Sequence, residues 1–206
     1  MVIDGIYYAL ALVAGGALIS YLTRPWLGLP LFILAAFCLY FFRDPERQIP
    51  PGPVAVAPAD GKVVALKKVQ SGRSRISIFL NVFDVHVNRA PISGVITDIC
   101  YQSGKFLVAS KEEASTQNEM NTATIEGDGT QVVFKQIAGL IARRIVFRKK
   151  TGDAVEKGER VGMIKFGSRT DVELGPEWEI VVQPGMRVSA GSSVIARRVG
   201  TSEVSE

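Results

Sequence analysis

Two long apolar runs open the chain, and the residues after them alternate between polar and apolar. Residues 5–22 and 26–42 contain no charged side chain, and only Thr23-Arg24-Pro25 separates them. Each run reaches the lower end of the roughly 17 to 25 residues that a helix needs to span a hydrocarbon core. The pattern predicts a transmembrane helical hairpin over residues 1–42, which would act as a membrane anchor.

A cleaved signal peptide fits this segment poorly. It would carry a basic N-terminal region and one short apolar core, whereas residues 1–4 hold no basic residue and the apolar run is doubled. A pair of buried core helices stays open as an alternative. Aromatic residues favour the membrane, because they gather near the ends of the two runs, as in an aromatic belt: Tyr7, Tyr8, Tyr21, Trp26, Tyr40 and Phe42. Arg43 and Arg47 follow the second run, so the positive-inside tendency predicts a catalytic or binding domain on the cytoplasmic face of the cell membrane.

Residues 43–53 form a proline-rich segment, which predicts a stiff, extended linker. Beyond it, β-branched and alternating residues occur in short stretches between glycine-rich or polar turns, which is typical of a mostly β domain over residues 54–206. Ile76, Ile78, Leu80 and Val82 would share one face of a strand. The predicted strands are 62–69, 76–82, 94–101, 131–138, 145–148, 161–166, 177–183 and 193–197, and only 106–117 has a weak helical pattern.

A short motif occurs twice in the second half of the chain. The pattern G-x-x-V-x-x-G-x-x-V begins at Gly152 and again at Gly185, 33 residues later. Two similar hairpin corners are therefore predicted. Paired corners of this kind resemble the flattened β-sandwich of biotinyl and lipoyl carrier domains. Those domains carry a modified lysine in Met-Lys-Met or Asp-Lys-Ala, neither of which occurs here, so the resemblance concerns the fold alone.

Composition narrows the range of functions. Residues 1–42 hold one acidic and one basic residue, so the remaining chain keeps the whole net charge of +4. A mildly basic domain beside a bilayer suits a negatively charged lipid partner, and solubility alone is the alternative explanation of the charge. The sequence contains no G-x-G-x-x-G, no P-loop, no C-x-x-C and no histidine pair for a metal. We therefore expect no bound metal and no nucleic-acid partner. Cys38 and Cys100 are expected to be packing residues.

Three separate residues offer the parts of an activated hydroxyl. His86 is the single histidine, Asp60 lies in an Asp-Gly turn signal, and Ser168 follows Gly167 after an apolar run. Each alone is more often structural. Together they could orient an imidazole, remove a proton and attack a carbonyl. If Ser168 attacked the carbonyl of Gly167, an N-to-O acyl shift, elimination and hydrolysis would break the chain and leave a pyruvoyl group at 168. The glycine would leave that carbonyl uncrowded.

The sequence resembles the membrane-anchored phosphatidylserine decarboxylases, particularly their short branch. Four ordered motifs carry the resemblance: "FFRDPER" at 41–47, "PADGKVV" at 58–64, "HVNRAP" at 86–91 and "FGSRTDVELG" at 166–175. The resemblance implies self-cleavage between Gly167 and Ser168 into a β chain, 1–167, and an α chain, 168–206. It also implies a pyruvoyl cofactor formed from Ser168, with Asp60 and His86 as catalytic residues. Longer members have a second histidine where this sequence has Arg89.

The resemblance implies a lyase that decarboxylates phosphatidylserine, or a related anionic serine phospholipid, to phosphatidylethanolamine. By charge type, Asn88, Arg89 and Arg144 are candidates for binding the phosphate or the carboxylate of the substrate. Two alternatives stay open: a membrane-tethered carrier or adaptor without activity, and a serine hydrolase that uses Ser168 on an external ester. Whether two copies form a homodimer is also open.

Overall fold

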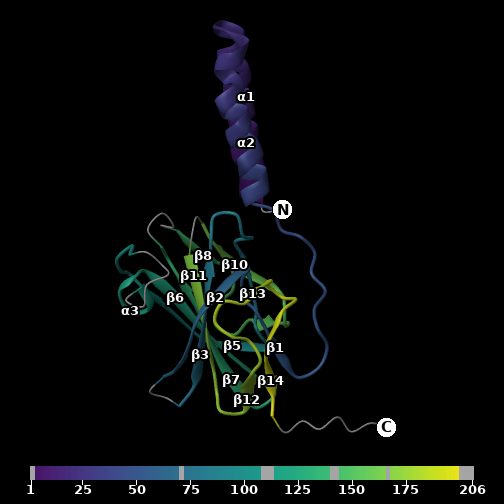
Figure 1. Ribbon diagram of the computed structural model, residues 1–206, viewed down its shortest axis with the longest axis vertical. Helices are drawn as coiled ribbons and strands as arrows, with labels where there is room; N and C mark the ends of the chain where they lie inside the picture. The colour runs from purple at the N-terminus through teal and green to yellow at the C-terminus, as the bar shows by residue number, and fades with distance from the viewer. Residues whose placement is uncertain (1–2, 70–71, 108–113, 140–143, 166–167, 200–206) are drawn as a thin grey trace. The chain divides into compact units, whose positions relative to one another are not determined.

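The computed structural model describes residues 3–69, 72–107, 114–139, 144–165 and 168–199. The chain divides into two compact units, 1–46 and 47–206. The first contains the apolar helices, and the second contains all the strands that are described (Figure 1). The chain is thus mostly β, as the alternating pattern predicted.

The first unit is a helical hairpin. Helix α1 covers Ile3–Leu22, a 3-10 turn covers Pro25–Gly28, and helix α2 covers Leu29–Phe41. The helices approach closely, since a Cβ on Gly16 of α1 would lie 3.1 Å from a ring carbon of Phe32 in α2. By length and composition, α1 could cross a membrane. Helix α2 has 13 residues and is shorter than the second span that the sequence predicted, because the first residues of that run form the 3-10 turn. Thirteen residues rise only about 20 Å.

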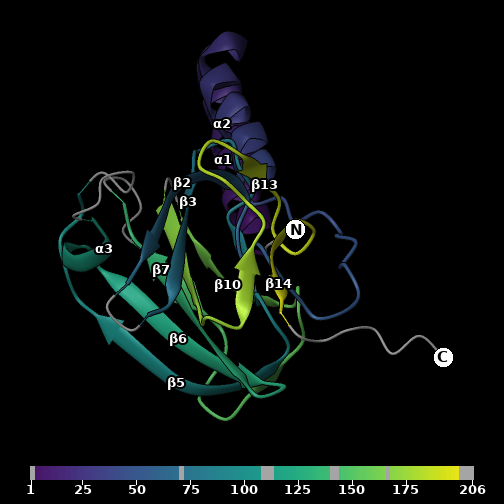
Figure 2. The same ribbon diagram turned by 60° about the horizontal axis from the view of Figure 1, so that its bottom comes forward.

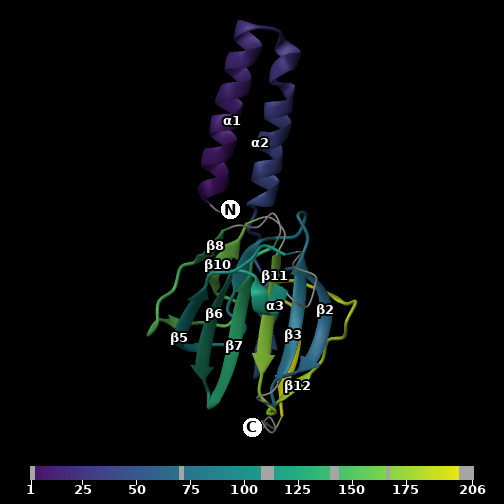
Figure 3. The same cartoon turned by 90° about the vertical axis from the view of Figure 1, so that its left-hand side faces the viewer.

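The second unit contains three antiparallel sheets in its described part. The large sheet has the strand order β13-β2-β3-β11-β7-β6-β5-β9, and the two small sheets have the orders β1-β14-β12 and β4-β10-β8. Figure 3 shows β5, β6, β7, β11, β3 and β2 side by side. The strands of the large sheet are β2 (Gly61–Lys68), β3 (Ser74–Leu80), β5 (Gly94–Gln102), β6 (Met120–Gly127), β7 (Thr130–Ile137), β9 (Ala154–Val155), β11 (Ser168–Leu174) and β13 (Arg187–Val188). Those of the small sheets are β1 (Val54–Val56), β4 (Val87–Arg89), β8 (Ile145–Phe147), β10 (Arg160–Ile164), β12 (Trp178–Ile180) and β14 (Val194–Arg198).

One hydrophobic core joins the large sheet to the small ones. Ile78, Phe134 and Val172 come from the large sheet, and they share a cluster with Val161 and Ile195 of the small sheets. Figure 2 shows the large sheet curling, with β10 and β14 on one side of it. Apolar side chains that alternate along each strand therefore meet between two layers, as in a sandwich.

Most predicted strands are confirmed, with shifts of one or two residues at their ends. Ile76, Ile78 and Leu80 are all buried, but β3 ends at Leu80 and Val82 lies in the following turn. Residues 177–183 contain only the short strand β12. The sequence analysis missed β6 and β11 and four short strands. Its helix over 106–117 is reduced to α3, Ala114–Gln117, in the described residues, and 108–113 lie outside them.

The repeated motif does form two equivalent corners. Its four glycines have nearly matching left-handed φ angles: +93° and +80° at Gly152 and Gly158, and +97° and +76° at Gly185 and Gly191. The corners meet, since a Cβ on Gly191 would lie 3.6 Å from the Cα of Gly158. A side chain at any of these positions would strain the turn, so glycine is needed there.

The same 33-residue offset also relates the strands that the two corners pair with. Strands β1 and β2 correspond to β4 and β5, and each pairs with the corresponding corner strand: β1 with β14 and β4 with β10, β2 with β13 and β5 with β9. The connecting turns read Ala-Pro-Ala-Asp-Gly at 57–61 and Ala-Pro-Ile-Ser-Gly at 90–94. The domain thus contains an internal duplication, in which Asp60 and Ser93 occupy equivalent positions.

Candidate active site

Ser168 is the first residue of β11, a central strand of the large sheet. It pairs with Leu80 of β3, while β7 runs along the other side of β11. Its side chain is 0 % exposed, and among the described residues its Oγ has no hydrogen-bond partner. Gly167 lies outside the described residues, so the predicted scissile bond is described on its serine side only. Burying a hydroxyl without a hydrogen bond costs free energy. Such groups are rare in native structures and are typical of residues that react or bind a ligand.

His86 lies in the connection between β3 and β4. The connection begins with a tight turn, in which the backbone N–H of Asn81 donates to Oδ2 of Asp84 at 2.9 Å and that of Phe83 donates to Oδ1 of Asn81 at 2.7 Å. The backbone N–H of Ile164 donates to the carbonyl of His86 at 3.4 Å. Leu80, just before the turn, is opposite Ser168, and Ile164 precedes Ser168 by four residues. The segment of His86 is therefore attached to strands on both sides of the Gly167–Ser168 bond.

A backbone carbonyl fixes the tautomer of His86. Nδ1 of the fully buried imidazole lies 2.8 Å from the carbonyl oxygen of Asp84. Because a carbonyl only accepts, Nδ1 must carry the hydrogen, and Nε2 of the neutral ring then holds a lone pair. Nε2 is therefore the nitrogen at which the neutral imidazole can accept a proton.

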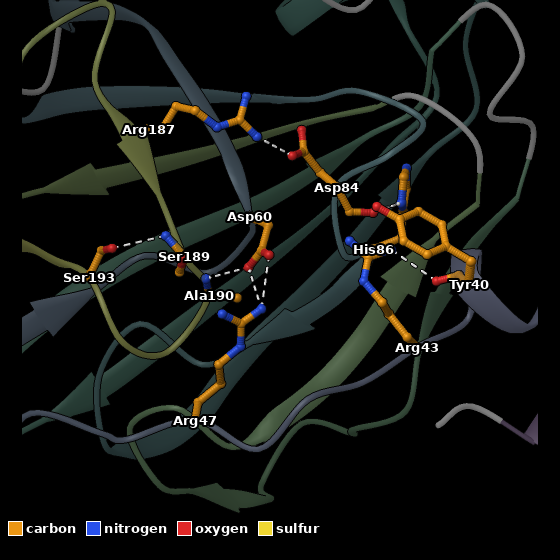
Figure 4. Close-up of polar contacts among 10 residues, drawn as sticks. All are labelled: Tyr40, Arg43, Arg47, Asp60, Asp84, His86, Arg187, Ser189, Ala190 and Ser193. Carbon is orange, nitrogen blue, oxygen red and sulfur yellow. Dashed lines mark hydrogen bonds and ion pairs between the residues drawn. The ribbon is translucent and has the colours of Figure 1, made fainter.

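Asp60 is held by partners other than the histidine. The side chain of Arg47 donates to both of its carboxylate oxygens, at 3.0 and 2.9 Å, and the backbone N–H of Ala190 donates to Oδ1 at 2.7 Å. Figure 4 shows the carboxylate directed at these groups, with Asp84 and His86 in the same region. In the duplicated half, Oγ of Ser93 accepts from the N–H of Lys157 at 2.9 Å. In both halves the residue at this position therefore accepts a hydrogen bond from a backbone N–H of the glycine corner. Asp60 differs from Ser93 in carrying a negative charge.

Two contacts join the predicted β and α chains beside the candidate site. Ala190 binds Asp60, and the side chain of Arg187 forms an ion pair with Oδ1 of Asp84 (Figure 4). Asp60 and Asp84 precede residue 168, whereas Ala190 and Arg187 follow it. Asp84, whose carbonyl fixes the tautomer of His86, is thus held by a residue of the predicted α chain. The sequence analysis did not identify Asp84 or Arg187.

The charge of the residue after Ser168 is paired with a neighbouring carboxylate. Arg169 is 1 % exposed, and its guanidinium donates to both carboxylate oxygens of Asp171, at 2.7 and 3.2 Å, and to Oγ of Ser77 at 2.6 Å. Nε of Arg75 lies 3.7 Å from Asp171. Arg169 and Asp171 alternate with Ser168 along β11, so they occupy the opposite face of the sheet. The ion pair fixes the strand that Ser168 begins.

The three predicted substrate-binding residues differ in setting. Asn88 is 0 % exposed, and its Oδ1 accepts from Gln136 at 2.9 Å. Arg89 is 5 % exposed and donates to the carbonyl of Gly158 at 2.9 Å, within the corner region. Arg144 is exposed. Asn88 lies two residues after His86, in the adjoining strand β4. The backbone carbonyl of Arg144 accepts from the N–H of Lys165 at 3.3 Å, and Lys165 follows Ile164, which binds the carbonyl of His86.

Comparison with known proteins shows one consistent relationship. The family model for phosphatidylserine decarboxylase matches residues 34–196. A protein of Solibacter usitatus named phosphatidylserine decarboxylase proenzyme is 67% identical over 199 residues, covering 97% of both chains. Proteins of the same name from Magnetococcus marinus and Carboxydothermus hydrogenoformans are 42% and 45% identical, covering 94% and 96% of both chains.

Proposed function

The chain belongs to the phosphatidylserine decarboxylase family and is an enzyme of phospholipid metabolism, and we propose that its cofactor is a pyruvoyl group made from its own Ser168. The observation that carries the proposal is the buried Oγ of Ser168, which has no partner among the described residues and follows directly on Gly167. The proenzyme names of the relatives fit a chain that is cut into two.

Self-cleavage begins with Ser168 as the nucleophile. Its Oγ attacks the carbonyl carbon of Gly167 while His86 takes the hydroxyl proton at Nε2 and passes it to the departing peptide nitrogen, so the amide becomes an ester and a free amine. Loss of the α-proton of residue 168 then expels the carboxylate of Gly167 and leaves a dehydroalanine. Water enters, ammonia leaves, and the new terminus is pyruvoyl. The products are a β chain, 1–167, and an α chain, 168–206.

In the mature enzyme the pyruvoyl group would supply a ketone for the amine of the serine headgroup and a sink for the electrons that remain when carbon dioxide leaves. His86 then returns a proton to the carbon that lost the carboxylate, from a ring whose Nδ1 stays bound to Asp84. Asp60 keeps the α chain beside this ring through Ala190. Asn88, Arg89 and Arg144 are proposed to contact the phosphate or the carboxylate of the headgroup.

The helical hairpin is proposed to anchor the enzyme in the membrane that contains its substrate. Helix α1 could cross the bilayer by length and composition, and its side chains are largely unburied within the structure. Arg43 and Arg47 follow the hairpin, which favours a catalytic domain on the cytoplasmic face.

A denaturing gel of the purified protein tests the proposal. Wild type should give two fragments, and Ser168→Ala should give one chain of 206 residues without decarboxylase activity, because alanine offers no nucleophile. If the protein were instead a serine hydrolase or a carrier, the wild type would give one chain. The proposal is wrong if wild type and Ser168→Ala are both uncleaved and equally active.

A further inference from the structure

Three buried polar atoms beside the start of β11 have no hydrogen-bond partner in the described part of the chain. They are Oγ of Ser168, Oγ1 of Thr170 and Nδ2 of Asn88, and all three residues are 0 % exposed. Ser168 and Thr170 are two residues apart on one strand and thus share a face. The reaction uses Ser168, whereas Thr170 has no role in it and Asn88 has so far been proposed only by residue type to contact the phosphate or the carboxylate of the headgroup. Buried polar groups are nearly always paired, so two unpaired ones in this part of the domain call for an explanation, and a bound ligand is one.

A chain of amides determines which atom of Asn88 is presented. Nε2 of Gln136 donates to Oδ1 of Asn88 at 2.9 Å and lies 3.4 Å from the carbonyl oxygen of Val146, while Oε1 of Gln136 accepts from Asn121 at 3.3 Å. A carbonyl oxygen can only accept, so the group that Gln136 turns to Val146 is its NH₂. Oδ1 of Asn88 must therefore face Gln136, which leaves the NH₂ of Asn88 as the unpaired group.

A glycine makes room for this arrangement. Gly162 of β10 pairs with Asn88, and a Cβ there would lie 2.3 Å from the carbonyl oxygen of Val146 and 3.0 Å from Nε2 of Gln136. Any side chain at 162 would separate Gln136 from the two groups that orient it. The amide chain is thus built into the packing of two sheets.

Thr170 lies beside the same amides. It is directly opposite Gln136 in the pairing of β11 with β7, and the side chains of such a pair project on the same face about 5 Å apart. The hydroxyl of Thr170 and the NH₂ of Asn88 therefore belong to one patch, together with Ser168. Both groups can donate, and neither carries a charge.

We infer that Asn88 and Thr170 bind the carboxylate of the serine headgroup, which deepens the proposed function and rests on it. Two donors without an acceptor call for acceptor oxygens, and the substrate has a carboxylate next to the amine that reacts at residue 168. Neutral donors suit this reaction, because the carboxylate becomes uncharged carbon dioxide. A cation would stabilise the ionised substrate more than the transition state and so raise the barrier. The neighbouring cation, Arg169, is on the other face and is already paired with Asp171.

The same two donors distinguish substrate from product. Phosphatidylethanolamine lacks the carboxylate, so its binding would leave the NH₂ of Asn88 and the hydroxyl of Thr170 unpaired. A site built to bind a polar group rejects the analogue that lacks it. Product release is favoured for the same reason.

Calorimetric titration of the full-length Ser168→Ala protein in detergent tests the inference without catalysis. Glycerophosphoserine should bind more tightly than glycerophosphoethanolamine, by roughly 5- to 100-fold for two neutral hydrogen bonds. Adding Thr170→Val should weaken glycerophosphoserine by about 2- to 10-fold and leave glycerophosphoethanolamine unchanged. Adding Asn88→Asp should weaken it more, since the introduced side chain keeps an acceptor for Gln136 but places an anion against the carboxylate of the ligand. Thr170→Ser, which keeps the hydroxyl, should bind like the parent.

Controls separate this result from misfolding and from the proposed function. Thr170→Val should melt no lower than its parent, because the deleted hydroxyl has no partner to lose among the described residues. If the parent binds the two headgroups with equal affinity, or binds neither of them, the inference is wrong and water molecules are the partners of the two donors. When Ser168 is restored, Thr170→Val and Asn88→Asp should still self-cleave to completion. Slowed cleavage with unchanged binding would mean that the donors serve a carbonyl of the chain, which also overturns it. An uncleaved wild type would refute the proposed function instead.

Discussion

Removing the carboxylate of Asp171 should destabilise the domain severely. Asp171 is 0 % exposed and compensates the guanidinium of Arg169, which is 1 % exposed, while Arg75 lies 3.7 Å away. Asp171→Asn leaves a buried cation without its counter-ion, and breaking a buried pair in this way costs about 3–5 kcal/mol. That is a large part of the roughly 5–15 kcal/mol that stabilises a typical domain. At about 2–4 °C per kcal/mol for a chain of this size, the melting temperature should fall by roughly 6–20 °C.

Glu173→Gln is the matched control for this substitution. Glu173 lies on the same strand and the same face, and its ion pair with Lys135 at 2.6 Å has partners that are 13% and 23% exposed. A pair in contact with solvent contributes about 0–1 kcal/mol, so its loss should shift melting little. Both variants are compared in the Ser168→Ala background by circular dichroism, so that every chain is uncleaved.

A third variant distinguishes charge from shape. Arg169→Met with Asp171→Leu removes both charges, and this double variant should recover most of the stability lost in Asp171→Asn. If Asp171→Asn melts no lower than Glu173→Gln, the buried pair does not hold β11 and the reasoning fails. With Ser168 present, Asp171→Asn should also leave more precursor uncleaved, because its effect falls on the strand that begins at the nucleophile.

Three further predictions concern the base, the anchor and one acidic residue. His86→Ala should slow self-cleavage by roughly 100- to 10,000-fold, the usual value of general-base assistance, as followed by the disappearance of precursor on denaturing gels; normal cleavage would make His86 structural. The fragment 47–206 should stay in solution without detergent, whereas the full-length protein should sediment with membranes at low and high salt alike; a full-length protein that stays in solution would remove the anchor. Burial raises the pKa of Glu177, but the hydrogen bond from Thr130 and the charges of Arg198 and Arg73 outweigh it, so the pKa lies below its usual value. The stability that this depressed pKa contributes is fully present above the ordinary value of 4.5 and is lost as pH falls from there through the folded-state pKa. Glu177→Gln should therefore reduce the pH dependence of the unfolding free energy between these two values, and an unchanged pH dependence would contradict this role of Glu177.

Patterns of period two predicted most of the sheet, but charge concealed its central strand. Residues 168–174, Ser-Arg-Thr-Asp-Val-Glu-Leu, contain three charged side chains and resemble a polar turn. The structure buries Arg169 and Asp171 as a pair on one face, while Val172 and Leu174 belong to the core on the other. The alternation of Ser168, Thr170, Val172 and Leu174 with charged residues was the signal that could have revealed it.

Pairwise chemistry was harder to predict than the location of the site. The motifs pointed to Ser168, His86 and Asp60, and the structure describes all three within the same domain. The partners of Asp60 come from residues 13 positions before it and 130 after it, and the imidazole is oriented by a backbone carbonyl, which no residue type reveals. The repeated glycine corners were predictable because their conformation depends on residue type alone.

The mass of the denatured small fragment tests the central claim most directly. If Ser168 becomes the cofactor, wild type yields an α chain of 39 residues that is lighter than the hydrolysis product of the Gly167–Ser168 bond by one ammonia molecule, and that resists Edman sequencing because it has no terminal amine. A wild-type protein that decarboxylates phosphatidylserine at full rate as a single chain of 206 residues, or with an α chain that begins in serine, would contradict the pyruvoyl mechanism.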